Sequence, residues 1–157
     1  MNQFLTDLDT RDLDGNKSRL IAPLVFDSAI AGGMVIAFAG FETDWASIPQ
    51  AAQAIIPRNG LWDWAAVIHD LGYKFNGAVP VFQRDGKAHV LTLERQGWDD
   101  ILLEGMYAKD VSEAVAMLIY NAVRAGGSGA WAGHAAESAV YPIADVRRWL
   151  VGSGLLS

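Results

Sequence analysis

The chain lacks cysteine and is poor in charge. Zero cysteines among 157 residues exclude a disulfide framework, a cysteine-ligated zinc finger and a cysteine nucleophile. Charged residues make up only 19% of the chain, whereas hydrophobic residues make up 52%, with six Trp and six Phe. This balance is typical of a folded core and not of a disordered chain. A chain of this length can bury well over half of the surface that its unfolded form exposes.

Long basic runs and long apolar runs are also missing. The net charge is −6, and Arg147-Arg148 is the only adjacent basic pair, so the overall field repels phosphate backbones and anionic lipids. The longest apolar stretches, such as 29–39, are too short to cross a bilayer. The N-terminus is acidic and lacks the residue order of a signal peptide. We therefore expect a protein that binds neither nucleic acid nor membrane and that carries no export signal.

The pattern of strands and helices predicts an α+β protein with one domain, rich in β-structure over 1–60 and mainly helical over 61–157. Extended segments around Asp14-Gly15 and a further run of β-formers predict an N-terminal antiparallel β-meander. A second β-hairpin is expected near 79–91. The meander is expected to pack against a C-terminal cluster of three to four helices.

The helices are predicted from apolar spacing and from terminal signals. They are expected over 51–56, over 61–75, from an N-cap at Thr92 to about 108, from a capping pair of Asp110 and Glu113 to Gly126, and from about 135 to 150 with a start or break at Pro142. The Gly-rich stretch 126–133 carries no Lys-Ser or Lys-Thr of a phosphate-binding loop. It is therefore interpreted as a flexible connection.

Two ionisable residues, His69 and Asp70, stand in an otherwise apolar helix. Buried ionisable groups must be paired or must line a cleft, because burying an isolated charge is costly. Residues 69 and 73 are one helical turn apart, so His69 and Tyr73 share a face, while Asp70 is rotated by about 100°. The alternative is a core histidine held by a hydrogen bond, with Asp70 exposed or capping a neighbour.

Two further segments carry polar residues among apolar ones. Arg95 and Asp99 are spaced for an intrahelical ion pair. A solvated pair on the helix surface is the alternative to a functional role for them. Asp100 is a second candidate carboxylate if the register of the helix differs. The loop F-E-T-D-W-A-S-I-P holds Thr43, Asp44 and Ser47. Their functional interpretation makes Asp44 a metal ligand or general base, and the alternative is a cap or turn role.

Four blocks of the sequence, read in order, resemble a known family. They are F-E-T-D-W-A-S-I-P, A-A-V-I-H-D-L-G-Y, R-Q-G-W-D and Y-N-A-V-R-A-G-G, within about 36–131. They resemble domain-of-unknown-function family 1353, a family of small phage and prophage proteins. The family's characteristic polar residues fall on Thr43, Asp44, Ser47, His69, Asp70, Tyr73, Arg95 and Asp99. Trp98 departs from the family pattern, which tends to have a small residue before the acid.

The resemblance implies phage origin, with synthesis in the host cytoplasm and association with the virion or with lysis of the cell wall. Two hypotheses follow for the site. In the first, the protein is a hydrolase that acts on peptidoglycan, with His69, Asp70, Asp44, Arg95 and Asp99 as catalytic groups. The substrate-binding residues of this hypothesis are Thr43, Ser47 and Tyr73. A divalent metal, zinc or manganese, would be held by His69, Asp44 and Asp99. In the second, the protein is a non-catalytic structural or assembly protein whose partners are other phage proteins, and the same residues form a polar network.

Overall fold

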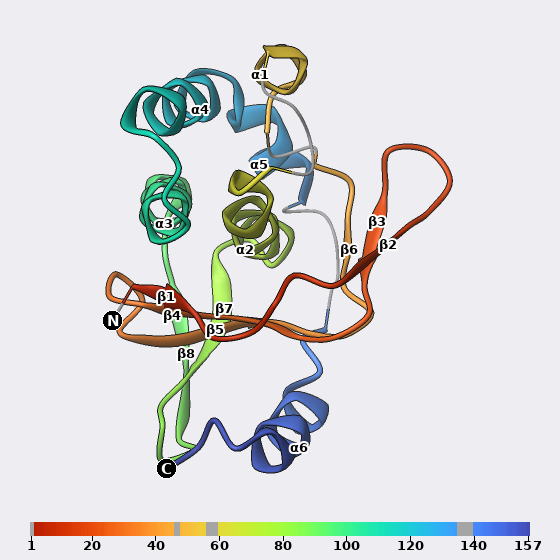
Figure 1. Cartoon of the computed structure of the whole chain (residues 1–157), viewed down its shortest axis with the longest axis vertical. Helices are drawn as coiled ribbons and strands as arrows, with labels where there is room; N and C mark the ends of the chain where they lie inside the picture. The colour runs from red at the N-terminus through yellow and green to blue at the C-terminus, as the bar shows by residue number, and fades with distance from the viewer. Residues whose placement is uncertain (1, 46–47, 56–59, 135–139) are drawn as a thin grey trace.

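A computed structural model describes residues 2–45, 48–55, 60–134 and 140–157 (Figure 1). A five-stranded antiparallel sheet has the order β1 (Gln3–Phe4), β4 (Leu24–Ser28), β5 (Gly33–Ala37), β7 (Ala78–Phe82) and β8 (Ala88–Thr92). A smaller antiparallel sheet has the order β2 (Thr10–Asp12), β3 (Ser18–Leu20) and β6 (Glu42–Thr43). The helices are α1 (Gln50–Ile55), α2 (Trp62–Lys74), α3 (Arg95–Ala108), α4 (Glu113–Gly126), α5 (Ser128–His134) and α6 (Ile143–Ser153). The predicted α+β class is confirmed.

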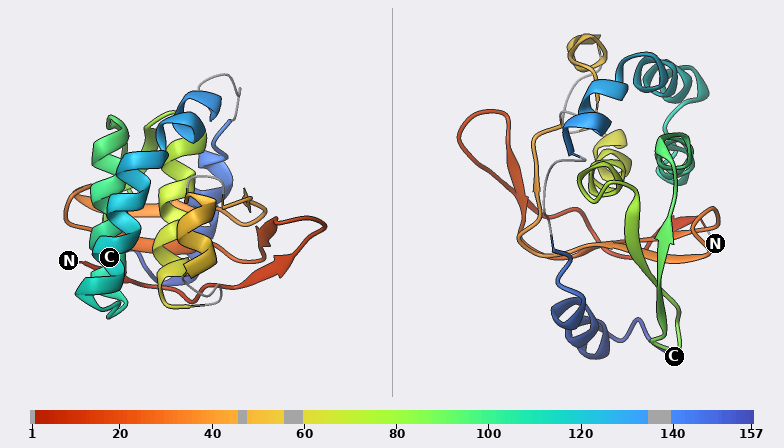
Figure 2. Two further views of the ribbon diagram at one scale, coloured as in Figure 1. Left: turned by 90° about the horizontal axis from the view of Figure 1, so that it is seen from above. Right: turned by 180° about the vertical axis from the view of Figure 1, so that it is seen from behind.

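Helices cover both faces of the five-stranded sheet (Figures 1 and 2). On one face lie α2 and α3, with α4, α5 and α1 in a further layer beyond them, and α6 lies on the opposite face. Alternate residues of β5 enter two different cores: Val35 faces the larger core with α2 and α3, whereas Ile36 faces the smaller core with Val146 and Leu150 of α6. Because both faces are covered, successive residues 24–26 of β4 and 34–37 of β5 are apolar without alternation.

The second hairpin forms where the sequence predicts it, and it joins the main sheet. β7 pairs with β5 as well as with β8, through the register Met34↔Phe82 and Val35↔Val81. The hairpin therefore extends the sheet that the N-terminal strands begin. Among the described residues, no helix is long and apolar enough to cross a membrane.

Three local predictions are wrong. Thr92 is the last residue of β8, and α3 begins after Glu94, whose side chain makes no cap bond. Ser112, and not Asp110, caps α4, because its hydroxyl accepts a hydrogen bond from the backbone N–H of Val115. The stretch expected to be a flexible connection contains the short helix α5. The last helix begins after Pro142, and 135–139 lie outside the described residues.

Candidate functional site

The helices α2 and α3 pack directly against each other, and each presents a glycine at the contact. A Cβ atom on Gly72 would collide with the buried indole of Trp98, and one on Gly105 would lie 2.8 Å from the Cβ atom of Ala65. The Trp98 indole N–H donates to the carbonyl of Gly77 at 3.1 Å. The large residue before Asp99 is therefore accommodated by a glycine on the facing helix. This close approach brings the polar side chains of α2 within reach of those on α3.

Asp99 of α3 is the centre of a buried polar cluster. Its Oδ1 atom accepts hydrogen bonds from His69 Nε2 at 2.7 Å and from the Tyr73 hydroxyl at 2.6 Å. The predicted common face of His69 and Tyr73 is confirmed, since their ring centroids lie 4.2 Å apart. All three residues are buried, with exposed fractions of 0%.

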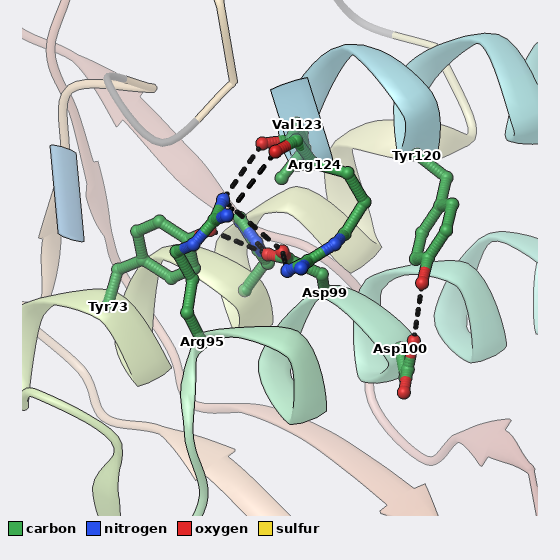
Figure 3. Close-up of polar contacts among 8 residues, drawn as sticks. Tyr73, Arg95, Asp99, Asp100, Tyr120, Val123 and Arg124 are labelled. Carbon is green, nitrogen blue, oxygen red and sulfur yellow. Dashed lines mark hydrogen bonds and ion pairs between the residues drawn. The ribbon is translucent and has the colours of Figure 1, made fainter. Parts of the chain in front are cut away.

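Two arginines complete the cluster from the solvent side (Figure 3). Arg124 of α4 lies with Nη1 2.6 Å from Asp99 Oδ2, and Arg95 of α3 lies with Nη1 3.7 Å from the same oxygen. Arg95 also donates to the carbonyls of Val123 and Arg124 at 3.2 and 3.3 Å. The side chains of Arg95 and Arg124 are 21% and 31% exposed. Asp99 therefore links three helices through both of its oxygens.

The electrostatics of the cluster hold Asp99 as a carboxylate. Burial by itself raises the pKa of Asp99, but hydrogen bonds from His69, Tyr73 and Arg124 outweigh burial, and the net pKa is lowered. Because a carboxylate only accepts, Nε2 of His69 carries the proton in this bond. Burial and the bond to Asp99 raise the pKa of Tyr73 well above its ordinary value. The bond to Asp99 likewise raises the pKa of Arg124.

The chemistry of this arrangement is that of a sealed network and not of an open site. A carboxylate that orients an imidazole also occurs in hydrolases, where the imidazole must reach the proton that it moves. Here His69, Tyr73 and Asp99 are buried, and only the two guanidinium groups reach solvent. The expectation that Arg95 and Asp99 form an ion pair is correct, but Asp99 is buried and the pair is not a solvated one.

The other predicted site residues lie elsewhere. Asp70 is buried on α2, on a different face from His69. Thr43 is buried at the end of β6, where it pairs with Ser18, and its hydroxyl accepts a hydrogen bond from the N–H of Trp45 at 3.3 Å. This contact is the turn role that the sequence left open for Thr43.

The remaining two residues of the loop block differ in how far the structure describes them. Asp44 is half-buried in the loop after β6. Ser47 lies outside the described residues.

The predicted metal set is not formed. Among the residues that the structure describes, no three His, Asp or Glu side chains are grouped so that they could hold a metal ion, and His69, Asp44 and Asp99 are all described. Both oxygens of Asp99 already accept from protein donors. A zinc or manganese ion at Asp99 would have to displace these donors.

Sequence reasoning missed two residues that hold the helices in place. Arg124 belongs to the block Y-N-A-V-R-A-G-G, and a basic residue directly after the buried Val123 could have signalled an acidic partner in the core. Glu104 of α3 is buried and accepts hydrogen bonds from the Ser28 hydroxyl at 2.5 Å and from the Ala29 N–H at 2.8 Å. It anchors α3 to the turn between β4 and β5.

The comparisons with known proteins give one match. A family model described as "Protein of unknown function (DUF1353)" matches residues 18–123. This range contains His69, Tyr73, Arg95 and Asp99, and Arg124 lies directly after its end. No curated protein and no solved structure matches the chain.

Proposed function

Since the chain belongs to the DUF1353 family, whose description assigns no activity, we propose its function from its geometry: it is a structural or assembly protein of phage type. In this proposal the Asp99 cluster is a polar network that fixes α2, α3 and α4 relative to one another. The observation that carries the proposal is the saturation of Asp99. Both of its oxygens accept from protein donors at 2.6 to 2.7 Å.

The burial of the cluster supports a structural role. A general base must lie within about 2.6 to 3.2 Å of the substrate atom whose proton it removes, or reach that atom through one water. His69 is 0% exposed, so a substrate reaches it only if the groups that cover it move. A fully satisfied buried network, in contrast, restricts the helices to one packing.

An assembly protein also needs a contact surface, and β8 offers one. It is the last strand in the order of the five-stranded sheet, and Val90 on it is 62% exposed. Native edge strands are commonly protected by lysine or proline, and the sequence Ala88–Thr92 contains neither. Pairing of this edge with the same edge of a second copy would complete its backbone hydrogen bonds.

Sedimentation velocity tests this contact: the wild type should associate as its concentration rises, and Val90→Lys should remain monomeric. A monomeric wild type at all concentrations would contradict this contact.

The structural role of the cluster is tested with two histidines in one chain. His69→Ala removes a buried hydrogen-bond donor to Asp99 and leaves a void. This should lower the free energy of unfolding by about 2 to 5 kcal/mol. For a chain of this size that is a fall in melting temperature of roughly 4 to 20 °C. His89→Ala removes an exposed imidazole from β8 and should change the melting temperature by less than about 2 °C. Equal melting temperatures for His69→Ala and the wild type, in dilute protein, would remove the structural role.

One observation favours a second candidate function, a hydrolase acting on peptidoglycan. His69 Nε2 lies 2.7 Å from Asp99 Oδ1, which is the arrangement by which a carboxylate orients a catalytic imidazole. Dye release from labelled peptidoglycan, with and without added zinc or manganese, tests this candidate. Release that is lost in both His69→Ala and Asp99→Asn, but kept in the similarly destabilised Glu104→Gln, would establish the hydrolase and overturn the purely structural proposal.

A further inference from the structure

A hollow of about 200 Å³ lies away from the Asp99 cluster, between the β2–β3 hairpin, the loop after β6 and the start of α2. Its walls combine carboxylates, hydroxyls and indoles, from Asp12, Asp63, Thr10, Ser18, Trp45 and Trp64. Water occupies about 30 Å³ per molecule in the liquid, so the hollow has room for the end of one side chain. It is smaller than the usual site for a drug-sized ligand, which begins at about 300 Å³.

The described residues that line the hollow carry a negative charge. The hollow contains two aspartates, and none of the described residues that line it is basic. Asp63 is 5% exposed, and Asp12 Oδ1 accepts a hydrogen bond from the Ser18 hydroxyl at 3.0 Å. A cation that enters can make charge-assisted hydrogen bonds to these oxygens, which are stronger than bonds between neutral groups.

The aromatic walls also suit a cation. Trp64 already contacts a cation from the same chain, because the Nζ atom of Lys109 lies 3.5 Å from the centre of its ring. Both residues line a neighbouring hollow. Ammonium and guanidinium groups are attracted to the faces of indole rings, more strongly where water is excluded. Trp64 lines both hollows, so the residue whose ring already contacts a lysine also borders the first hollow.

The second indole is held in place by the loop block that contains Thr43. Trp45 has a φ of 61°, a left-handed conformation that is unusual for a bulky residue. The Thr43 hydroxyl accepts from the Trp45 N–H, and the Gln53 side chain donates to the Trp45 carbonyl at 2.9 Å. Strained backbone of this kind persists only where neighbouring contacts impose it. Here those contacts fix the indole that lines the hollow.

We propose that this hollow binds a primary ammonium or guanidinium group of the size found at the end of a lysine or arginine side chain. The two carboxylates accept its N–H bonds, and the indoles of Trp45 and Trp64 cover its apolar faces. The cation can come from a free small molecule or from a basic side chain of another protein, since the chemistry of the group is the same.

The proposal is tested with two matched probes, Nα-acetyl-L-argininamide and Nα-acetyl-L-citrullinamide. Acetylation removes the charge of the α-amino group, so the probes differ only in that citrulline carries a neutral urea in place of the guanidinium. The indole N–H signals of Trp45 and Trp64 in ¹H–¹⁵N NMR spectra report binding. The expected result is saturable shifts with the acetylated argininamide and none with the acetylated citrullinamide. Asp63→Asn and Asp12→Asn should each weaken binding about tenfold, because each removes one charged acceptor.

Asp145→Asn is the control, since Asp145 is exposed on α6 on the opposite side of the sheet. It should leave the affinity unchanged. A peptide with blocked ends and one central arginine that binds as well as the acetylated argininamide would identify a protein side chain as the source, and exclusion of the peptide would identify a free cation. Equal shifts with both probes, no shifts with either, or an equal loss in Asp145→Asn and Asp12→Asn would overturn the proposal. Asp12 lies on the hairpin, so its variant decides the matter even if Asp63→Asn does not fold.

Discussion

Replacing Asp99 by asparagine is the most informative single change in this chain. The substitution keeps the size of the side chain but removes its charge and one of its two acceptor oxygens. If the amide oxygen faces His69 and Tyr73, the amide NH₂ group faces Arg95 and Arg124, so donors oppose donors. Turning the amide around only moves the conflict to His69 and Tyr73.

The expected cost follows from the contacts. A hydrogen bond to a charged group contributes about 1.5 to 3 kcal/mol, and Asp99 accepts three at 2.6 to 2.7 Å. The contribution of Arg124 is discounted because its side chain is 31% exposed and solvent screens it. Asparagine retains part of one side of the network, which leaves a loss of about 3 kcal/mol. For a chain of this size the melting temperature should fall by roughly 6 to 12 °C.

The neighbouring residue supplies a matched control. Asp100 is half-buried and accepts a hydrogen bond from the Tyr120 hydroxyl at 2.7 Å (Figure 3). Asp100→Asn should cost less than about 1 kcal/mol, because the amide oxygen can still accept that bond. The assay is thermal unfolding followed by circular dichroism at neutral pH. Equal melting temperatures for Asp99→Asn and Asp100→Asn would refute the reasoning.

Further predictions concern pH, helix contact and the α3 anchor. Because the folded pKa of Asp99 is lowered from its ordinary value of 3.8, its contribution is fully present above that value and is lost as the pH falls through the folded pKa. In acid titrations the stability gap between wild type and Asp99→Asn should therefore be constant above about pH 5 and shrink below about pH 4; a gap that widens in acid would contradict the assignment. Gly72→Ala should lower the free energy of unfolding by more than about 2 kcal/mol, because it overpacks α2 against α3. Gly152→Ala on α6, with open space around its Cβ, should instead raise the free energy of unfolding by about 0.5 to 1 kcal/mol. Urea unfolding measures both variants, and equal effects would exclude the close contact. Glu104→Gln should cost about 1 to 3 kcal/mol, because an amide cannot accept from both Ser28 and the backbone, and an unchanged urea midpoint would show that this anchor is unimportant.

Local periodicity predicted much of the fold. The helix expected over 61–75 is α2, Trp62–Lys74, because its apolar residues recur at the spacing of a buried helix. Thr92 shows where local signals fail. It has the side chain of an N-cap, but pairing of β8 with β7 places it in a strand. A helix cap contributes about 1 kcal/mol, which sheet pairing outweighs.

The site was predicted in part, for a similar reason. That His69 and Tyr73 share a face follows from their spacing on one helix. That both meet Asp99 depends on Gly72, which lets the indole of Trp98 and with it α3 approach. A contact between two helices of this kind is not encoded in the spacing of either one. Arg124 comes from a third helix, so only the meeting of all three reveals its role.

The most direct test of the structural account is a double-mutant cycle between Asp99→Asn and Arg124→Met. The two side chains lie on different helices and contact each other at 2.6 Å, so the cycle measures whether the cluster ties α3 to α4. We predict that the double variant is more stable than the sum of the single effects implies, by about 1 to 2 kcal/mol. Strictly additive effects in urea unfolding would contradict the account.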